Sequence, residues 1–159
     1  YRGNHNVALG YKALYNSGRS FYNVAIGSKA LYNSGRGRHN IALGYQALLS
    51  STTSYYNVAI GFKALTLNTT GQYNIALGSG ALASNTTGSH NIGLGYAVDS
   101  GGFSGSVMIG SQAAATTNGQ LSLGSTTYPI GPITSETVTS DKTLQIRLNG
   151  VLHKILLKS

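Results

Sequence analysis

Asn23-Val24-Ala25-Ile26-Gly27 is one copy of a five-residue phrase that recurs through most of this chain of 159 residues. The phrase returns every seventeen residues in six regular copies, and two looser copies follow at shorter spacing, Ser106–Gly110 and Gln120–Gly124. A fixed period is typical of solenoids, in which each repeat forms one coil stacked on the next. The sequence therefore predicts about eight coils over residues 1–127. The regular copies begin at Asn6, Asn23, Asn40, Asn57, Asn74 and Asn91.

Each repeat has the composition of short strands joined by turns. Val24-Ala25-Ile26 alternates in side-chain size, and Gly27 after it can adopt the positive φ of a turn. Lys29–Tyr32 is predicted to form a second short strand, and Asn33–Arg36 has turn composition. Seventeen residues are too few for a leucine-rich repeat, so we predict an all-β parallel solenoid.

Alternation along the strand puts its first and third residues on one face and its middle residue on the other. We expect the large aliphatic residues, such as Val7, Leu9 and Leu14, to fill the inside of the coil. The small middle residues would then form an outer column that another backbone can approach closely, which predicts a subunit interface. The alternative is that alanine merely tolerates a strand surface. The column comprises Ala8, Ala25, Ala42, Ala59, Ala76 and Gly93.

The scarcity of acidic residues argues against an enzyme. The whole chain has three, Asp99, Glu136 and Asp141, whereas many hydrolases need paired carboxylates and calcium sites need clustered ones. Without cysteine there is no disulfide, thiolate metal site or thiol nucleophile. Left-handed β-helix acyltransferases use hexapeptide periods, and seventeen is not a multiple of six. We therefore predict no catalytic residue, cofactor or metal site.

Basic residues gather in residues 1–98, which hold seven Lys and Arg and no acid. Coils stack about 4.8 Å apart, so residues seventeen apart form columns, and like charges at that distance repel by roughly 1 kcal/mol in water. Such columns favour a polyanionic ligand, such as an acidic polysaccharide, lipopolysaccharide phosphate or an anionic cell surface. The alternative is a solvated face that maintains solubility. Nucleic acid is compatible with the charge, but no recognised nucleic-acid module is present, so we do not predict it. The candidate residues are Arg2, Arg19, Arg36, Arg38, Lys12, Lys29 and Lys63.

Aromatic residues also recur in phase, just before the asparagine and just after the glycine. Tyrosine suits carbohydrate through ring stacking and hydroxyl hydrogen bonds, although stacked aromatics also stabilise neighbouring coils or cover subunit seams. His5 and His39, two coils apart, would be about 9.6 Å apart, too far for one metal ion unless symmetry-related chains brought copies together. The candidate glycan-binding residues are Tyr11, Tyr22, Tyr45 and Tyr56.

A second region is predicted over residues 128–159, after the repeat has stopped. Pro129–Pro132 forms a break, because proline cannot donate to a strand ladder. Thr143–Leu148 and Val151–Leu157 flank Asn149-Gly150, a sequence that suits the type I′ turn of a β-hairpin. We predict that this hairpin caps the last coil or registers a trimer, and the alternative is a distal receptor-binding tip. The expected pairs are Leu148 with Val151, Ile146 with His153 and Leu144 with Ile155.

The recurring phrase, followed by an Ala-Leu pair, resembles the head repeats of trimeric autotransporter adhesins (YadA-like heads), which are also found in phage tail fibres and related bacterial surface fibres. Asn23–Gly27 and Asn57–Gly61 are the clearest copies, and the resemblance covers residues 1 to about 127. It implies a left-handed parallel β-roll that forms a homotrimer, in an extracellular, cell-surface or virion fibre that binds a surface. Family coils are commonly shorter, and the extra length here lies in turns such as Asn33–Arg36. The family has no single ligand site to carry over.

Together these observations predict a non-enzymatic, homotrimeric fibre or adhesin module. Its repetitive basic and aromatic surface would attach to cell-surface polysaccharide or another anionic ligand, without nucleic acid and without direct insertion into a membrane. The alternative is a purely structural spacer or tip whose binding site lies elsewhere in the full-length protein. Because Tyr1 falls in the middle of the pattern, we expect the chain to be part of a longer one.

Overall fold

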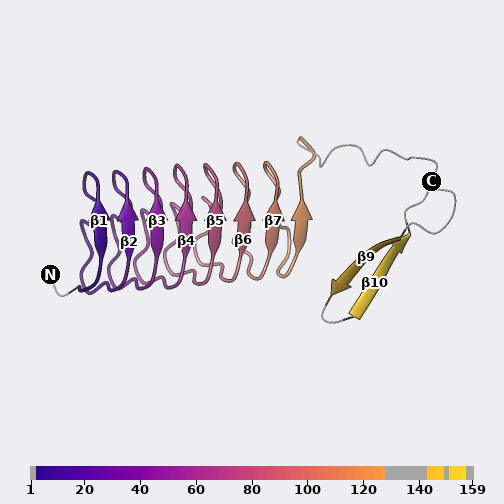
Figure 1. Ribbon diagram of the computed structural model, residues 1–159, viewed down its shortest axis with the longest axis horizontal. Helices are drawn as coiled ribbons and strands as arrows, with labels where there is room; N and C mark the ends of the chain where they lie inside the picture. The colour runs from indigo at the N-terminus through magenta and orange to yellow at the C-terminus, as the bar shows by residue number, and fades with distance from the viewer. Residues whose placement is uncertain (1–2, 128–142, 149–150, 157–159) are drawn as a thin grey trace.

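The chain folds into a parallel β-solenoid of about seven turns, without a helix among the described residues. The computed structural model describes residues 3–127, 143–148 and 151–156. Eight short strands stack in chain order into one parallel sheet (Figure 1), which confirms the predicted all-β solenoid. The strands are β1 (Val7–Leu9), β2 (Val24–Ile26), β3 (Ile41–Leu43), β4 (Val58–Ile60), β5 (Ile75–Leu77), β6 (Ile92–Leu94), β7 (Val107–Ile109) and β8 (Leu121–Leu123).

The register keeps every copy of the phrase in phase. Val24 pairs with Val7 on one side and with Ile41 on the other. Ile92 pairs with Val107 although they are only fifteen residues apart, because the connecting turns of that coil are shorter. The two looser copies therefore form coils of the same solenoid, as predicted.

The middle residue of the strands points into the coil and is small in β2–β6 and a methionine, Met108, in β7, so the predicted assignment of faces is wrong. The strand alanines of β2 to β5 and Gly93 of β6 are buried, and Ala8, in the first described coil, is exposed. The aliphatic strand residues point outward instead, with Val7 54% and Leu9 66% exposed. The predicted interface column is thus mainly core: Ala8, Ala25, Ala42, Ala59, Ala76 and Gly93.

The coil is too thin to hold aliphatic side chains from both of its sides. Residues 28–33 form a segment opposite β2, which we call the limb of that coil. Its Ala30 and Leu31 are fully buried. One leucine from each such limb occupies the interior, which leaves room only for alanine on the strand. The prediction that Leu14 lies inside is confirmed, since it is 7% exposed. Its fully buried equivalents are Leu31, Leu48, Leu65 and Leu82.

Side-chain sizes compensate across this narrow interior. In the coil of β6, Val98 occupies the limb position that is alanine in the preceding coils, and the facing strand residue is Gly93. A Cβ on Gly93 would lie 2.8 Å from both Val98 Cγ2 and Leu82 Cγ. The larger limb residue therefore requires the smaller strand residue.

The limb itself is a turn, so the second strand predicted at Lys29–Tyr32 is wrong. Lys29 and Leu31 have φ of 58° and 48°, in the left-handed region that non-glycine residues seldom adopt. The limb still bonds to both neighbouring coils. Lys29 N donates to Tyr11 O at 2.8 Å, and Leu31 N donates to Ala47 O at 3.0 Å.

Asparagine at the start of each phrase forms a buried amide ladder. Asn40 Oδ1 accepts hydrogen bonds from Asn57 N at 3.0 Å and from Asn57 Nδ2 at 3.1 Å. Asn57 Nδ2 also donates to Gly71 O at 2.9 Å. Because each asparagine needs another at the same phase in the adjacent coil, the ladder explains the strict recurrence of this residue.

Two further strands, β9 (Thr143–Leu148) and β10 (Val151–Leu156), pair antiparallel. Leu148 lies opposite Val151 and Leu144 opposite Ile155. The turn predicted at Asn149-Gly150 lies outside the described residues, as do residues 128–142 and 157–159. The hairpin, and its role as a cap or tip, therefore stay predictions.

Candidate interaction surfaces

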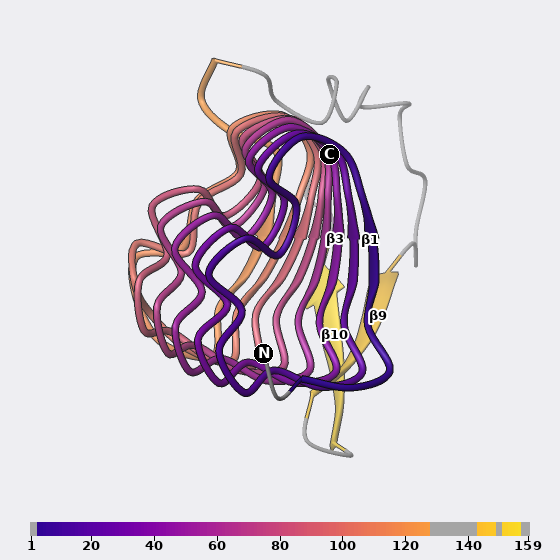
Figure 2. The same ribbon diagram turned by 90° about the vertical axis from the view of Figure 1, so that its left-hand side faces the viewer.

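The outward aliphatic residues of β1–β8 form a continuous surface, which we call the apolar sheet face. All eight strands lie along one side of the solenoid (Figure 2). Ile41 is 40% exposed and Leu43 36%, although each has a neighbouring strand on either side. Its members are Val7, Leu9, Val24, Ile26, Ile41, Leu43, Val58, Ile60, Ile75, Leu77, Ile92, Leu94, Val107, Ile109, Leu121 and Leu123.

The apolar sheet face carries no charged side chain, and aromatic residues border it in the sequence. With strands about 4.8 Å apart and residues about 3.3 Å apart, it measures roughly 34 Å by 10 Å. Two residues past the end of β1, β3, β4 and β6 come exposed aromatic rings. Exposed apolar patches of several hundred Å² mark interaction sites. The bordering rings are Tyr11, Tyr45, Phe62 and Tyr96.

The aromatic residues just before the asparagines stack into a ladder along the solenoid. Neighbouring ring centroids lie 4.8–5.0 Å apart with interplanar angles of 2–16°. Tyr22 and Tyr56 each stack between two neighbouring rings, so both faces of each ring are covered. Only the ring edges and hydroxyl groups remain accessible to a ligand. The ladder consists of His5, Tyr22, His39, Tyr56, Tyr73 and His90.

Lys12 lies among tyrosines at one corner of the first coils. Its Nζ is 5.2 Å from the ring centroid of Tyr11 and 5.3 Å from that of Tyr15, which itself stacks on Tyr32 at 5.4 Å. The hydrogen bond with Tyr11, followed by the electrostatic effects of Tyr11, Tyr32 and Tyr15, raises the pKa of Lys12. Lys29 is the equivalent residue of the next coil. This corner therefore combines positive charge with tyrosine rings.

The Lys63 corner repeats the arrangement further along the solenoid. Lys63 Nζ lies 5.2 Å from the ring centroid of Phe62, and Phe62 stacks on Tyr45 at 5.4 Å. The stacking covers one face of Tyr45. Four of the candidate residues thus lie in the turns that directly follow strands of the apolar sheet face: Lys12, Lys63, Tyr11 and Tyr45.

Three exposed arginines form a second basic surface, which we call the arginine patch: Arg19, Arg36 and Arg38. Arg19 and Arg36 occupy equivalent positions of consecutive coils, where Arg19 N donates to Gly35 O at 2.9 Å. The guanidinium of Arg38 lies 5.2 Å from the ring centroid of Phe21, which belongs to the coil that carries Arg19. The structure therefore brings these predicted residues together. Arg2, predicted in the same column, lies outside the described residues.

Positive charge is confined to the first half of the solenoid. Within residues 3–127 every Lys and Arg lies between Lys12 and Lys63, and residues 64–127 contain none. Asp99 is the sole acid in residues 3–127, and it accepts hydrogen bonds from Ser84 Oγ and Gly101 N. The cations of the first coils therefore have no carboxylate beside them in the solenoid.

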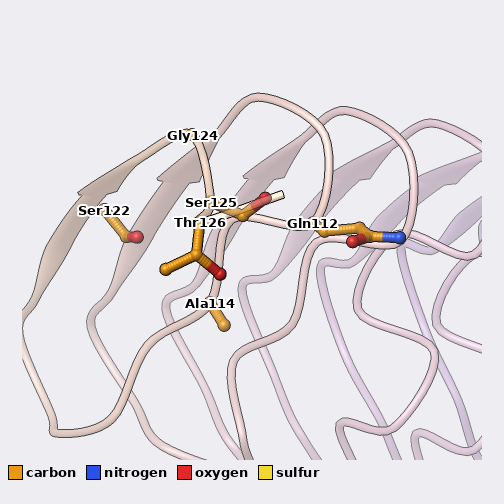
Figure 3. Close-up of a pocket in the computed structure, with 6 residues that line it drawn as sticks. All are labelled: Gln112, Ala114, Ser122, Gly124, Ser125 and Thr126. Atoms are coloured by element: carbon orange, nitrogen blue, oxygen red, sulfur yellow. The ribbon is translucent and has the colours of Figure 1, made fainter. Parts of the chain in front are cut away.

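A shallow hollow of about 390 Å³ lies at the end of the solenoid, near β8 (Figure 3). It contains no titratable side chain, so it holds no candidate acid, base or activated nucleophile. The lining residues are Gln112, Ala114, Ser122, Gly124, Ser125 and Thr126.

Neither a metal cluster nor a membrane-spanning helix is present in the part of the chain that the structure describes. No three His, Cys, Asp or Glu residues lie close enough there to hold a metal ion. No helix in those residues is long and apolar enough to cross a bilayer.

No protein-family model, curated protein or solved structure matches this chain. A parallel β-solenoid is a general architecture, and one architecture hosts many functions. The function therefore has to be argued from the surfaces of the molecule.

Sequence reasoning missed the apolar sheet face, although the sequence contains a signal for it. The pairing of Gly93 with Val98, where the other regular coils pair two alanines, indicates that the small strand residue packs against the limb. When a larger residue at one position is accompanied by a smaller residue at the facing position, both side chains share a closely packed interior. The alternating aliphatic residues must then face outward.

Proposed function

We propose that this chain is a non-enzymatic fibre or adhesin module that assembles as a homotrimer through the apolar sheet face. In this assembly three left-handed rolls lie side by side with parallel axes. The basic outer surface attaches the fibre to a cell surface or glycan. The apolar sheet face is the observation that carries the proposal.

The exposed aliphatic area contributes to the free energy of association. About 340 Å² of aliphatic sheet, at about 25 cal/mol per Å², corresponds to roughly 8 kcal/mol per chain when it is covered. The bordering aromatic column, which includes Tyr11 and Phe62, would add to this area.

Copies of the same chain fit this surface better than an unrelated partner. The aliphatic columns repeat at the strand spacing of about 4.8 Å, so a second copy with its axis parallel stays in step along the whole length. Because the apolar sheet face carries no charge, symmetric contact places no like charges together, despite the net charge of +8. Closed cyclic symmetry then covers the face of every copy, and the number three comes from the resemblance to adhesin heads.

A structural spacer is the second candidate. It is favoured by residues 64–127, which contain no Lys or Arg and so offer no basic surface for attachment. In this case the coils set the length of the fibre, and receptor contacts lie elsewhere in a longer protein.

The mass of the chain in solution tests the assembly. We expect light scattering to give three times the chain mass of 16.5 kDa. Replacing Ile41 and Ile75 together by Asp should give monomers with unchanged β circular dichroism, because both side chains point away from the core. Thr70→Asp, at an exposed position outside the apolar sheet face, is the matched control and should stay trimeric. A folded monomeric wild type would contradict the proposal.

A further inference from the structure

We propose that the arginine patch binds an anionic polysaccharide that lies along the solenoid axis, with about one sugar for each coil. This inference rests on the proposed function, because it assigns the ligand and the position of the attachment surface. It selects Arg19, Arg36 and Arg38 from the basic and aromatic candidates. The corners around Lys12 and Lys63 contain the rings Tyr11 and Phe62, which border the apolar sheet face.

The arginine patch concentrates charge that nothing in the solenoid neutralises. Arg19 and Arg36 extend from consecutive coils, and Arg38 leans over Phe21 toward the coil of Arg19. Residues 3–98 contain no acid at all. Three guanidinium groups held within two coils repel one another, and a bound polyanion relieves that repulsion.

The arginine patch stays accessible when the apolar sheet face is covered. Arg36 comes ten residues after Ile26, the end of β2, and five before Ile41, the start of β3. It therefore lies in the segment that connects the two strands, as does Arg38, three residues before Ile41. Figure 2 shows that the connecting segments bulge away from the side on which the strands lie. A trimer assembled through its strands would leave these connecting segments, which carry the exposed arginines, uncovered.

The spacing of the coils suits a sugar polymer. Coils repeat about every 4.8 Å, which is close to the length of one pyranose unit in an extended chain. A guanidinium group binds carboxylate or sulfate through two parallel hydrogen bonds, so adjacent arginines can each hold the acidic group of successive sugars. The arginine patch spans two consecutive coils, roughly 5 Å from one to the next, which corresponds to about two sugars.

The surroundings of the arginine patch favour polysaccharide over single-stranded nucleic acid. Single-stranded nucleic acid binds through bases stacked on free aromatic faces. Here the inner rings of the ladder, including His39 beside Arg38, have neighbours on both faces. The ring of Phe21 is covered by Arg38. Charge and hydrogen-bond donors remain, and those suit acidic sugars without any stacking platform.

Calorimetry with heparin-derived oligosaccharides of two, four and six sugars tests the inference. We expect the affinity of the wild-type chain to change little from two sugars to six, and to fall with added salt. Replacing Arg19, Arg36 and Arg38 by Ser should weaken binding of the tetrasaccharide roughly 30-fold or more. The corresponding three-lysine variant should keep the salt dependence but bind several-fold more weakly, because it loses the bidentate contacts.

A matched control replaces uncharged residues by Ser in the arginine columns, one and two coils beyond Arg36 and Arg38. Thr53→Ser, Thr70→Ser and Gln72→Ser together should leave the affinity unchanged. Neutral dextran oligosaccharides should not bind, and oligothymidylate should bind more weakly than the tetrasaccharide.

Three outcomes would overturn the inference: undiminished binding by the triple serine variant, tighter binding of oligothymidylate, or no binding by a wild-type chain whose mass is that of a trimer. The last outcome would leave the proposed assembly intact. A folded monomer in the mass measurement, in contrast, would remove the assembly without deciding whether acidic sugars bind. The two proposals can therefore fail separately.

Discussion

At the scale of the residue, glycine marks the positions where neighbouring coils come closest. Gly27 has a φ of 126°, and a Cβ there would lie 2.6 Å from Gly44 O of the next coil. Both the conformation and the close backbone contact exclude a side chain. Gly80 also has positive φ, 66°, but a Cβ there would come no closer than 3.8 Å to Ala97.

This contrast predicts different costs for the same substitution. Gly27→Ala should lower the free energy of unfolding by about 3 kcal/mol or more, because strain and a backbone clash add together. Gly80→Ala should cost only about 1 kcal/mol, since it adds strain alone. Urea unfolding followed by circular dichroism at fixed protein concentration measures both, and equal costs would contradict the close approach at Gly27.

Compensation between Gly93 and Val98 gives a second prediction at this scale. Gly93→Ala alone should cost about 2 kcal/mol, because the new Cβ overlaps Val98 and Leu82. In a Val98→Ala background the same change should cost less, because only the overlap with Leu82 remains. A double-mutant cycle in urea gives the coupling energy. A coupling near zero would show that Gly93 does not face the interior as described.

At the scale of the element, the buried asparagine ladder ties each coil to the next. Asn57 Oδ1 accepts from Asn74 N at 2.9 Å and from Asn74 Nδ2 at 3.1 Å. These groups are inaccessible to water, so removing their partner leaves them unsatisfied. An exposed asparagine pair offers a comparison, since Asn16 Nδ2 donates to Asn33 Oδ1 at 2.9 Å near the surface.

Asn57→Ala should therefore lower the free energy of unfolding by about 3 kcal/mol, whereas Asn16→Ala should cost less than about 0.5 kcal/mol. The substitutions are chemically identical, but Asn57→Ala removes four hydrogen bonds of a buried side chain, whereas Asn16→Ala removes one hydrogen bond near the surface. Chemical denaturation of the two variants side by side makes the comparison. Similar costs would mean that the buried ladder contributes no more than a surface contact.

The sequence predicted the elements better than their orientation. The phase of the asparagine phrase was enough to predict the parallel strands, their register and the aromatic and arginine columns. Alternation, however, shows only that neighbouring strand residues point to opposite faces, and it does not show which face is buried. The buried face depends on the space inside the coil, which is set by the path of the limb. That limb was predicted as a strand because nothing local shows that residues such as Leu31 adopt positive φ.

At the scale of the whole molecule, apolar surface and charge are separated. The apolar sheet face extends over β1–β8, whereas Lys and Arg of the solenoid are confined to the coils up to Lys63. In the proposed assembly, this division would let the entire length associate while one end attaches to an anionic ligand. The same separation explains why the basic columns were predictable from sequence and the apolar sheet face was not: charged side chains almost always lie on the surface, whereas aliphatic side chains are usually buried.

Protection of a single thiol tests most directly whether other copies cover the apolar sheet face. The chain has no cysteine, so Leu43→Cys introduces one reporter on that face and Thr70→Cys introduces one elsewhere on the surface. We predict that in the folded protein Cys-reactive maleimide modifies the Leu43→Cys variant at least tenfold more slowly than the Thr70→Cys variant, and that the difference disappears in urea. Equal rates in the folded protein would show that the apolar sheet face is open to solvent and would contradict the assembly.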